Sequence, residues 1–99
     1  MQILTIDEVK KELRVDNDFD DEIIIGYIAD ATAYINTVTG YDWTKESEID
    51  PLCKRCAKLY IKQEHFETEY KKDYDYTLGI SSLIYLLNCK VGEKNASKI

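Results

Sequence analysis

The segment from residue 20 to 39 constrains the fold most, because apolar residues recur along it at helical spacing. The main row steps by four and three residues: Ile24, Ile28, Ala31, Ile35 and Val38. A second row lies beside it: Ile23, Tyr27 and Tyr34. Residues at these spacings share one face of an α-helix, and so broad a face suits a helix packed against two partners. We therefore predict a helix over 20–39, closed by Gly40 in the left-handed conformation that glycine tolerates.

The segments on either side carry helix-start signals. Thr5-x-x-Glu8 has the spacing of a capping box, which predicts a helix over 6–13. Asp50 followed by Pro51 is a typical helix start, because aspartate caps free amides and proline at the first position needs no donor. The apolar row that follows predicts a helix over 51–70.

A fourth helix is predicted over 81–88. Its expected buried face consists of Ile80, Leu83, Ile84 and Leu87. In the connection before the third helix, Tyr41 and Trp43 are expected to fold back over the core, where their polar atoms need partners. The sequence therefore predicts an all-α fold, a small bundle of about four helices.

Length and charge narrow the class of protein. With 99 residues the chain is expected to form one domain, which we place at 1–89. Residues 90–99 contain few apolar side chains, so we expect a mobile tail there. The net charge of −6 argues against binding nucleic acid by neutralising phosphates, which needs a basic face. No apolar run approaches the roughly 20 residues of a membrane span, and we expect no membrane segment.

Cys53 and Cys56 have the Cys-x-x-Cys spacing of zinc sites and redox centres. A structural zinc site needs four ligands, and the other soft candidates, Cys89 and His65, belong to no second pair. Residues three apart share a helix face, and free cysteine is often buried. We interpret the pair as core packing and predict no metal and no cofactor. His65 is expected to be a surface or half-buried side chain, with Phe66 in the core, and no catalytic residue is predicted.

Two groups of residues are candidates for a protein interface. The outer face of the predicted third helix carries a basic group: Lys54, Arg55, Lys58 and Lys62. The polar segment after that helix carries a second group: Tyr70, Lys71, Lys72, Tyr74 and Tyr76. Tyrosine is enriched in protein interfaces, but these rings could equally cover the open end of a small helical core. Both readings remain open.

Four stretches, taken together, carry a resemblance to a known family. They are LTIDEVKKELRVD (4–16), DFDDEIIIGYIADATAYINTVTG (18–40), DPLCKRCAKLYIKQEHFE (50–67) and LGISSLIYLL (78–87). Their order and spacing resemble the head–tail connector family of tailed double-stranded-DNA phages, the small head-completion adaptors. Cys53 and Cys56 depart from the family pattern, which has other small or apolar residues there, and this supports packing over chemistry.

The resemblance implies an all-α structural virion protein without catalysis. It implies a homo-oligomeric ring of about a dozen subunits, closed by head-to-tail contacts. Such a ring docks below the portal protein, meets tail-side stopper or adaptor proteins, and lets packaged DNA pass without sequence-specific binding. The implied location is the head–tail junction of the virion, with assembly in the host cytoplasm. The nine residues of the two groups are then candidates for the subunit or portal interface.

Two other classes of function stay open on the sequence alone. A small helical regulatory or adaptor domain, possibly one that binds DNA, would use the basic group as a recognition surface. A metal or redox protein would use Cys53, Cys56, His65 and Cys89. Salt-dependent duplex binding would favour the first, and bound zinc would favour the second.

Overall fold

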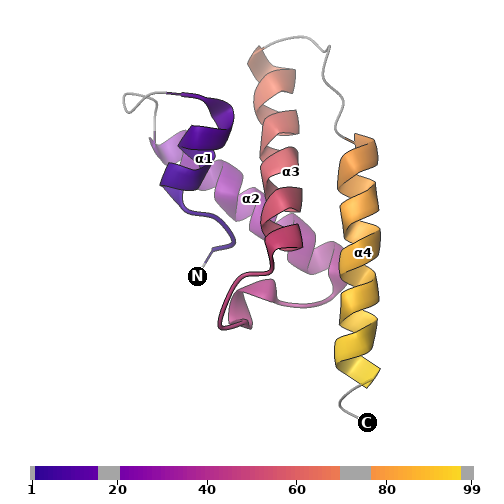
Figure 1. Cartoon of the computed structure of the whole chain (residues 1–99). Coiled ribbons are helices and arrows are strands. Elements are labelled where there is room, and N and C mark those ends of the chain that lie inside the picture. The colour runs from indigo at the N-terminus through magenta and orange to yellow at the C-terminus, as the bar shows by residue number, and fades with distance from the viewer. Residues whose placement is uncertain (1, 16–20, 70–76, 97–99) are drawn as a thin grey trace.

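A computed structural model describes residues 2–15, 21–69 and 77–96. These residues form four α-helices, a single 3-10 turn and no strand: α1 (Ile6–Leu13), α2 (Asp21–Thr39), η1 (Trp43–Lys45), α3 (Pro51–Glu69) and α4 (Thr77–Ala96). The predicted all-α fold is confirmed. In Figure 1, α3 and α4 run side by side in opposite directions, α2 crosses behind α3 and ends beside α4, and α1 packs beside the start of α2. None of the described helices has both the length and the apolar character to cross a membrane.

The predicted local signals set the helix ends. The Thr5 hydroxyl accepts a hydrogen bond from the Glu8 N–H at 3.2 Å, and the Glu8 carboxylate accepts one from the Thr5 N–H at 2.9 Å. The Asp50 carboxylate accepts from the Leu52 N–H at 2.8 Å at the start of α3. Gly40 follows α2 with a φ of +68°. Each interaction satisfies backbone groups that a helix end leaves without partners, so the predicted capping is confirmed.

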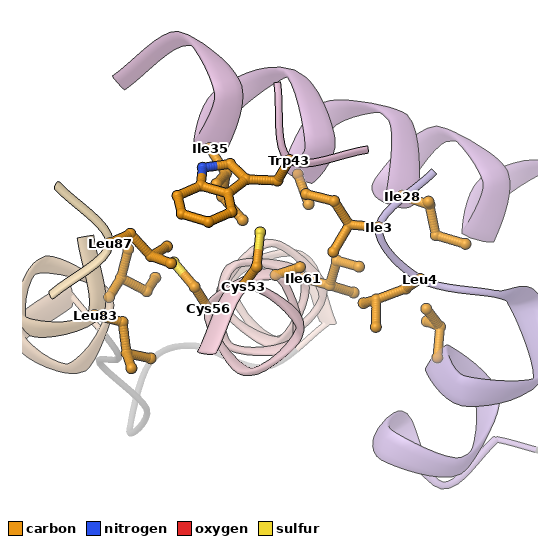
Figure 2. Close-up of a cluster of buried hydrophobic side chains, with 14 of the residues drawn as sticks. Ile3, Leu4, Ile28, Ile35, Trp43, Cys53, Cys56, Ile61, Leu83 and Leu87 are labelled. Atoms are coloured by element: carbon orange, nitrogen blue, oxygen red, sulfur yellow. The ribbon is translucent and has the colours of Figure 1, made fainter. Parts of the chain in front are cut away.

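The core lies between α2, α3 and α4, and the N-terminal segment, α1 and Trp43 of the 40–50 connection add buried side chains to it. Figure 2 shows Trp43 above α3, with Ile35 of α2 on one side and Leu87 of α4 on the other. Trp43 is fully buried, and its indole N–H donates to the Thr39 hydroxyl at 3.0 Å. The Tyr41 hydroxyl donates to the Glu46 carboxylate. The prediction that these two rings fold over the core with satisfied polar atoms is confirmed.

The buried face of α2 differs from the predicted one at its last turn. Ile24, Ile28, Ala31 and Ile35 are buried as expected. The final step is four residues rather than three, so Thr39 is buried and Val38 is 41% exposed. In the second row Tyr27 and Tyr34 are half-buried, whereas Ile23 is 46% exposed. The cause at the last turn is the hydrogen bond between Thr39 and Trp43, which the periodicity of α2 does not contain.

Helix α4 is longer than the predicted 81–88 at both ends, and it takes in most of the segment 90–99. The predicted buried face is nonetheless the observed one, since Ile80, Leu83 and Leu87 are buried. Beyond residue 89, Val91 is buried, Lys90 pairs with Asp50 at 2.7 Å, and Lys94 pairs with Glu46 at 2.9 Å. The fourth helix therefore does not end at residue 88 as predicted, because partners far away in the sequence extend it to Ala96. The division of the chain at residue 89 stays a prediction. Residues 97–99 lie outside the described residues.

Candidate protein interaction surfaces

Three of the four basic candidates on α3 bind acidic side chains of α1. Lys54 Nζ lies 2.8 Å from the Glu8 carboxylate, and Lys62 Nζ lies 2.6 Å from that of Glu12. Lys58 Nζ lies 3.9 Å from Glu12. These lysines line a shallow hollow along α3, to which α1 contributes Glu12. In the isolated chain the three lysines are thus paired with carboxylates of α1.

The lysines of α3 lower the pKa values of two carboxyl groups of α1, Glu8 and Glu12. Partial burial would raise the pKa of Glu8, but hydrogen bonds from Lys54 and Thr5 outweigh it and lower the pKa below its usual value. The hydrogen bond from Lys62 lowers the pKa of Glu12 against a smaller effect of burial. Arg55 is exposed and forms no ion pair with the described residues. The assignment of the basic group to an interface stays a prediction, and Arg55 is the member best placed for it.

The second predicted group cannot be located on the surface. Tyr70, Lys71, Lys72, Tyr74 and Tyr76 lie outside the described residues. Their assignment to an interface stays a prediction.

Cys53 and Cys56 are core residues. Both are fully buried on α3, and Figure 2 shows their sulfur atoms near Trp43 and Leu87. Burial raises the pKa of Cys53 to about 12 and that of Cys56 to about 11. Since the thiolate is the form that binds metals and attacks electrophiles, both thiols are held in their unreactive form. Within the described residues, no three His, Cys, Asp or Glu side chains gather as metal ligands.

His65 is buried, and the prediction of a surface or half-buried histidine is wrong. Its exposed fraction is 6%, and its ring meets that of Tyr27 edge-on, with 6.2 Å between ring centres. The reason is the register of α3: Ala57 and Ile61, both buried, lead to His65 at steps of four residues. The side chain of Phe66 lies outside the described residues.

The outer face of α4 is apolar as well, a feature that the sequence analysis missed. Leu78 is 80% exposed, Tyr85 68% and Leu86 45%, and we call these three residues the α4 patch. The signal was present in TLGISSLIYLLNC (77–89), which contains no charged residue. A helix that is apolar all round is normally buried on all sides. The outer face of α4 therefore has the character of a surface that another protein covers.

Two further apolar residues are exposed near the start of α2, Ile23 at 46% and Ile25 at 51%. Residues two apart on an α-helix point about 200° away from each other, so these side chains lie on opposite flanks of the buried row and form no common patch. Single exposed apolar residues are ordinary on a protein surface. Ile25 was absent from both predicted rows, because it lies on neither of the two buried faces.

Four packed helices with exposed apolar surface are typical of small helical proteins that act through contacts with other proteins. Residues 3–84 match the family described as phage gp6-like head–tail connector protein. The match covers most of the chain, and the chain belongs to this family. No curated protein and no solved structure matches it. The resemblance drawn from the four stretches is confirmed, and with it a structural role as a connector protein of the virion.

Proposed function

We propose that this chain is one subunit of a homo-oligomeric ring that joins portal and tail, retains packaged DNA and lets it pass. The proposal includes contacts with the portal protein and with tail-side stopper or adaptor proteins, and assembly in the host cytoplasm. The observation that carries it is the uncovered α4 patch in a chain of the connector family. A monomer leaves that patch in water, whereas a ring contact can cover it.

Removing the α4 patch from water would favour a contact between subunits. Each Å² of apolar surface removed from water stabilises a complex by about 25 cal/mol before the cost of association. The α4 patch includes a leucine that is 80% exposed and a tyrosine that is 68% exposed, and tyrosine often anchors interfaces. The net charge of −6 fits a conduit that does not bind DNA, because an acidic surface repels phosphates.

Assembly tests the proposal directly. The purified chain is examined by light scattering after gel filtration and by electron microscopy, alone and mixed with the portal protein of the same phage. We expect closed rings, formed either by the chain alone at high concentration or on the portal. A chain that stays monomeric under both conditions contradicts the proposal.

The DNA-binding alternative receives no support from the described residues. Lys54, Lys58 and Lys62 face carboxylates of their own chain, so they offer little positive charge to a duplex. Titration with duplex DNA at low salt distinguishes the connector proposal from the DNA-binding alternative. We expect no saturable binding, and binding that weakens steeply with added salt would revive the alternative.

A further inference from the structure

The hollow along the outer face of α3 is rich in positive charge, and we call it the α3 hollow. Its charged lining consists of Lys54, Arg55, Lys58, Lys62 and Glu12. The segment 51–62 contains these four cations and no acidic residue, although the whole chain has a net charge of −6. Positive charge is thus gathered on one face of an acidic protein.

The positive charge of the α3 hollow is only partly balanced within the chain. Its three lysines share two carboxylates, those of Glu8 and Glu12. Arg55 is exposed and forms no ion pair with the described residues. The part of the chain that the structure describes therefore leaves a small excess of positive charge here, centred on Arg55.

The stability of α3 gives no reason for cations at this place. The helix begins at Pro51 and has no acidic residue in its first turn. The first turn of a helix favours negative charge, because its free N–H groups carry partial positive charge. Lys54 lies in that turn, where Glu8 compensates it, and Arg55 follows directly without such a partner among the described residues. A local rule broken without a gain inside the fold is typical of a functional site.

The α3 hollow also has an apolar side, which Pro51, Leu52 and Leu59 form. Leu59 is held in place from the side of α4, since a Cβ atom at Gly79 would lie only 3.2 Å from its Cδ1 atom. Apolar walls with a few placed polar groups suit the side chains of another protein. The phosphates of a duplex would use the cations but not the apolar lining.

From these observations we propose that the α3 hollow binds an acidic segment of the portal protein, one with a large apolar side chain beside its carboxylates. Arg55 is the anchor, because its planar guanidinium can hold a carboxylate through two hydrogen bonds. The small excess of positive charge suits one or two carboxylates, whereas a duplex presents a negative charge about every 1.7 Å. This inference rests on the proposed function, whose ring contact uses the α4 patch and leaves the α3 hollow to a different protein.

Binding to the portal protein of the same phage tests the assignment. Arg55→Glu reverses the charge of the anchor, and Arg55→Lys keeps the charge but loses the planar geometry. Lys45→Glu makes the same charge change as Arg55→Glu at an exposed position of the 40–50 connection and is the matched control. Since negative charge near the start of a helix stabilises it, Arg55→Glu should leave the chain folded, which circular dichroism checks. Surface plasmon resonance on immobilised portal measures the affinities.

We expect Arg55→Glu to weaken portal binding about tenfold or more, since close charge pairs across interfaces contribute that much. Arg55→Lys should weaken it less, and Lys45→Glu should bind like wild type. Unchanged binding by Arg55→Glu, or an equal loss in Lys45→Glu, overturns the inference but leaves the proposed portal contact. A wild-type chain that does not bind the portal overturns both.

Two further outcomes would give the α3 hollow to another partner. If Arg55→Glu prevents self-assembly of the chain, the hollow belongs to the contact with a neighbouring copy. If wild type binds duplex DNA saturably and Arg55→Glu does not, the hollow belongs to DNA. Either outcome overturns the inference.

Photochemical cross-linking identifies the segment that occupies the hollow. In a Cys89→Ser background the buried Cys53 and Cys56 do not react, so Pro51→Cys places a single reactive thiol at an exposed position of the lining. A benzophenone maleimide on this thiol is activated in the complex with the portal, and mass spectrometry identifies the captured peptide. We expect a portal segment with an excess of acidic residues and a large apolar side chain. Ser47→Cys, exposed on the 40–50 connection, should not capture it. Capture of a segment without this character, or of the same segment from both positions, overturns the inference.

Discussion

The indole N–H of Trp43 is fully buried, so it needs a hydrogen-bond acceptor in the core. The Thr39 hydroxyl is that acceptor at 3.0 Å, and its own proton goes to the carbonyl of Ile35 at 2.7 Å. Thr39 of α2 thus supplies the acceptor that Trp43 of the connection needs. This small network links the end of α2 to the part of the core that surrounds Cys53 and Cys56.

Replacing Thr39 with valine tests this network. Thr39→Val keeps the shape and the β-branching but leaves the indole N–H without its acceptor, and we expect a loss of about 1–3 kcal/mol in the free energy of unfolding. Urea unfolding followed by the fluorescence of the single tryptophan measures it. Thr37→Val, at an exposed position of the same helix, is the control. Equal urea midpoints for the two variants would show that the hydrogen bond contributes nothing.

Residue-level features were predictable where the signal was local. Thr5, Gly40 and Asp50 act within a few residues of their partners, and their capping roles could be read from spacing. Thr39 was not predicted, because its burial depends on Trp43, which follows the end of the helix. His65 was misplaced for a related reason: the choice between two neighbouring residues depends on where α2 lies against α3.

At the scale of elements, α1 is attached to α3 by carboxylate–lysine pairs that depend on pH. The pKa values of Glu8 and Glu12 lie below their usual value of 4.5 in the folded chain. A carboxyl with a lowered folded pKa stabilises the fold above its unfolded pKa, and this contribution is lost as the pH falls through the folded pKa. Acid should therefore weaken the attachment of α1 to α3, while the buried Val9 and Leu13 continue to hold α1 in the core.

Glutamine substitution makes this prediction measurable. The double variant Glu8→Gln/Glu12→Gln keeps the capping box, because glutamine also fits its third position. We expect a lower urea midpoint than wild type at pH 7, and a difference that shrinks as the pH falls below about 4.5. Glu48→Gln, at an exposed position, should show little difference at any pH. A gap between double variant and wild type that persists at low pH would contradict the assignment.

The second half of α4 is held by contacts with the connection between α2 and α3. Val91 is buried, and Lys94 pairs with Glu46 while its ammonium lies 5.4 Å from the centre of the Tyr41 ring. A chain ending at residue 89 loses these contacts, so we expect a lower free energy of unfolding and less helix than in a chain ending at residue 96. Urea unfolding and circular dichroism measure both. Equal stability of the two chains would instead support the predicted domain boundary at residue 89.

The length of α4 illustrates the limit of periodicity for whole elements. Its buried row over 80–87 was predicted, because apolar residues at helical spacing carry that signal themselves. The extension to Ala96 was not, because residues 90–99 have few apolar side chains and the partners of Lys90 and Lys94 are in the connection before α3. The interface group around Tyr74 remains a prediction on residues that the structure does not describe.

At the scale of the whole molecule, charge and apolar surface are separated. Most of the basic group of α3 is engaged within the chain, while the α4 patch is uncharged. The sequence alone indicated the connector family. The order and spacing of its four stretches resemble the family pattern even though single residues, such as Cys53 and Cys56, differ from it. The sequence did not indicate the α4 patch, since a face becomes an exposed patch only after the other helices have been placed.

This separation predicts how assembly responds to salt. Raising the ionic strength from 0.1 M to 1 M shortens the screening length from about 10 Å to about 3 Å. Copies that each carry a net charge of −6 repel one another, so screening should leave assembly through the α4 patch unchanged or strengthen it. Sedimentation velocity of the chain at both salt concentrations measures this response. An Arg55→Glu variant should behave like wild type apart from its added repulsion. Dissociation at 1 M salt would instead assign the subunit contact to the basic group of α3.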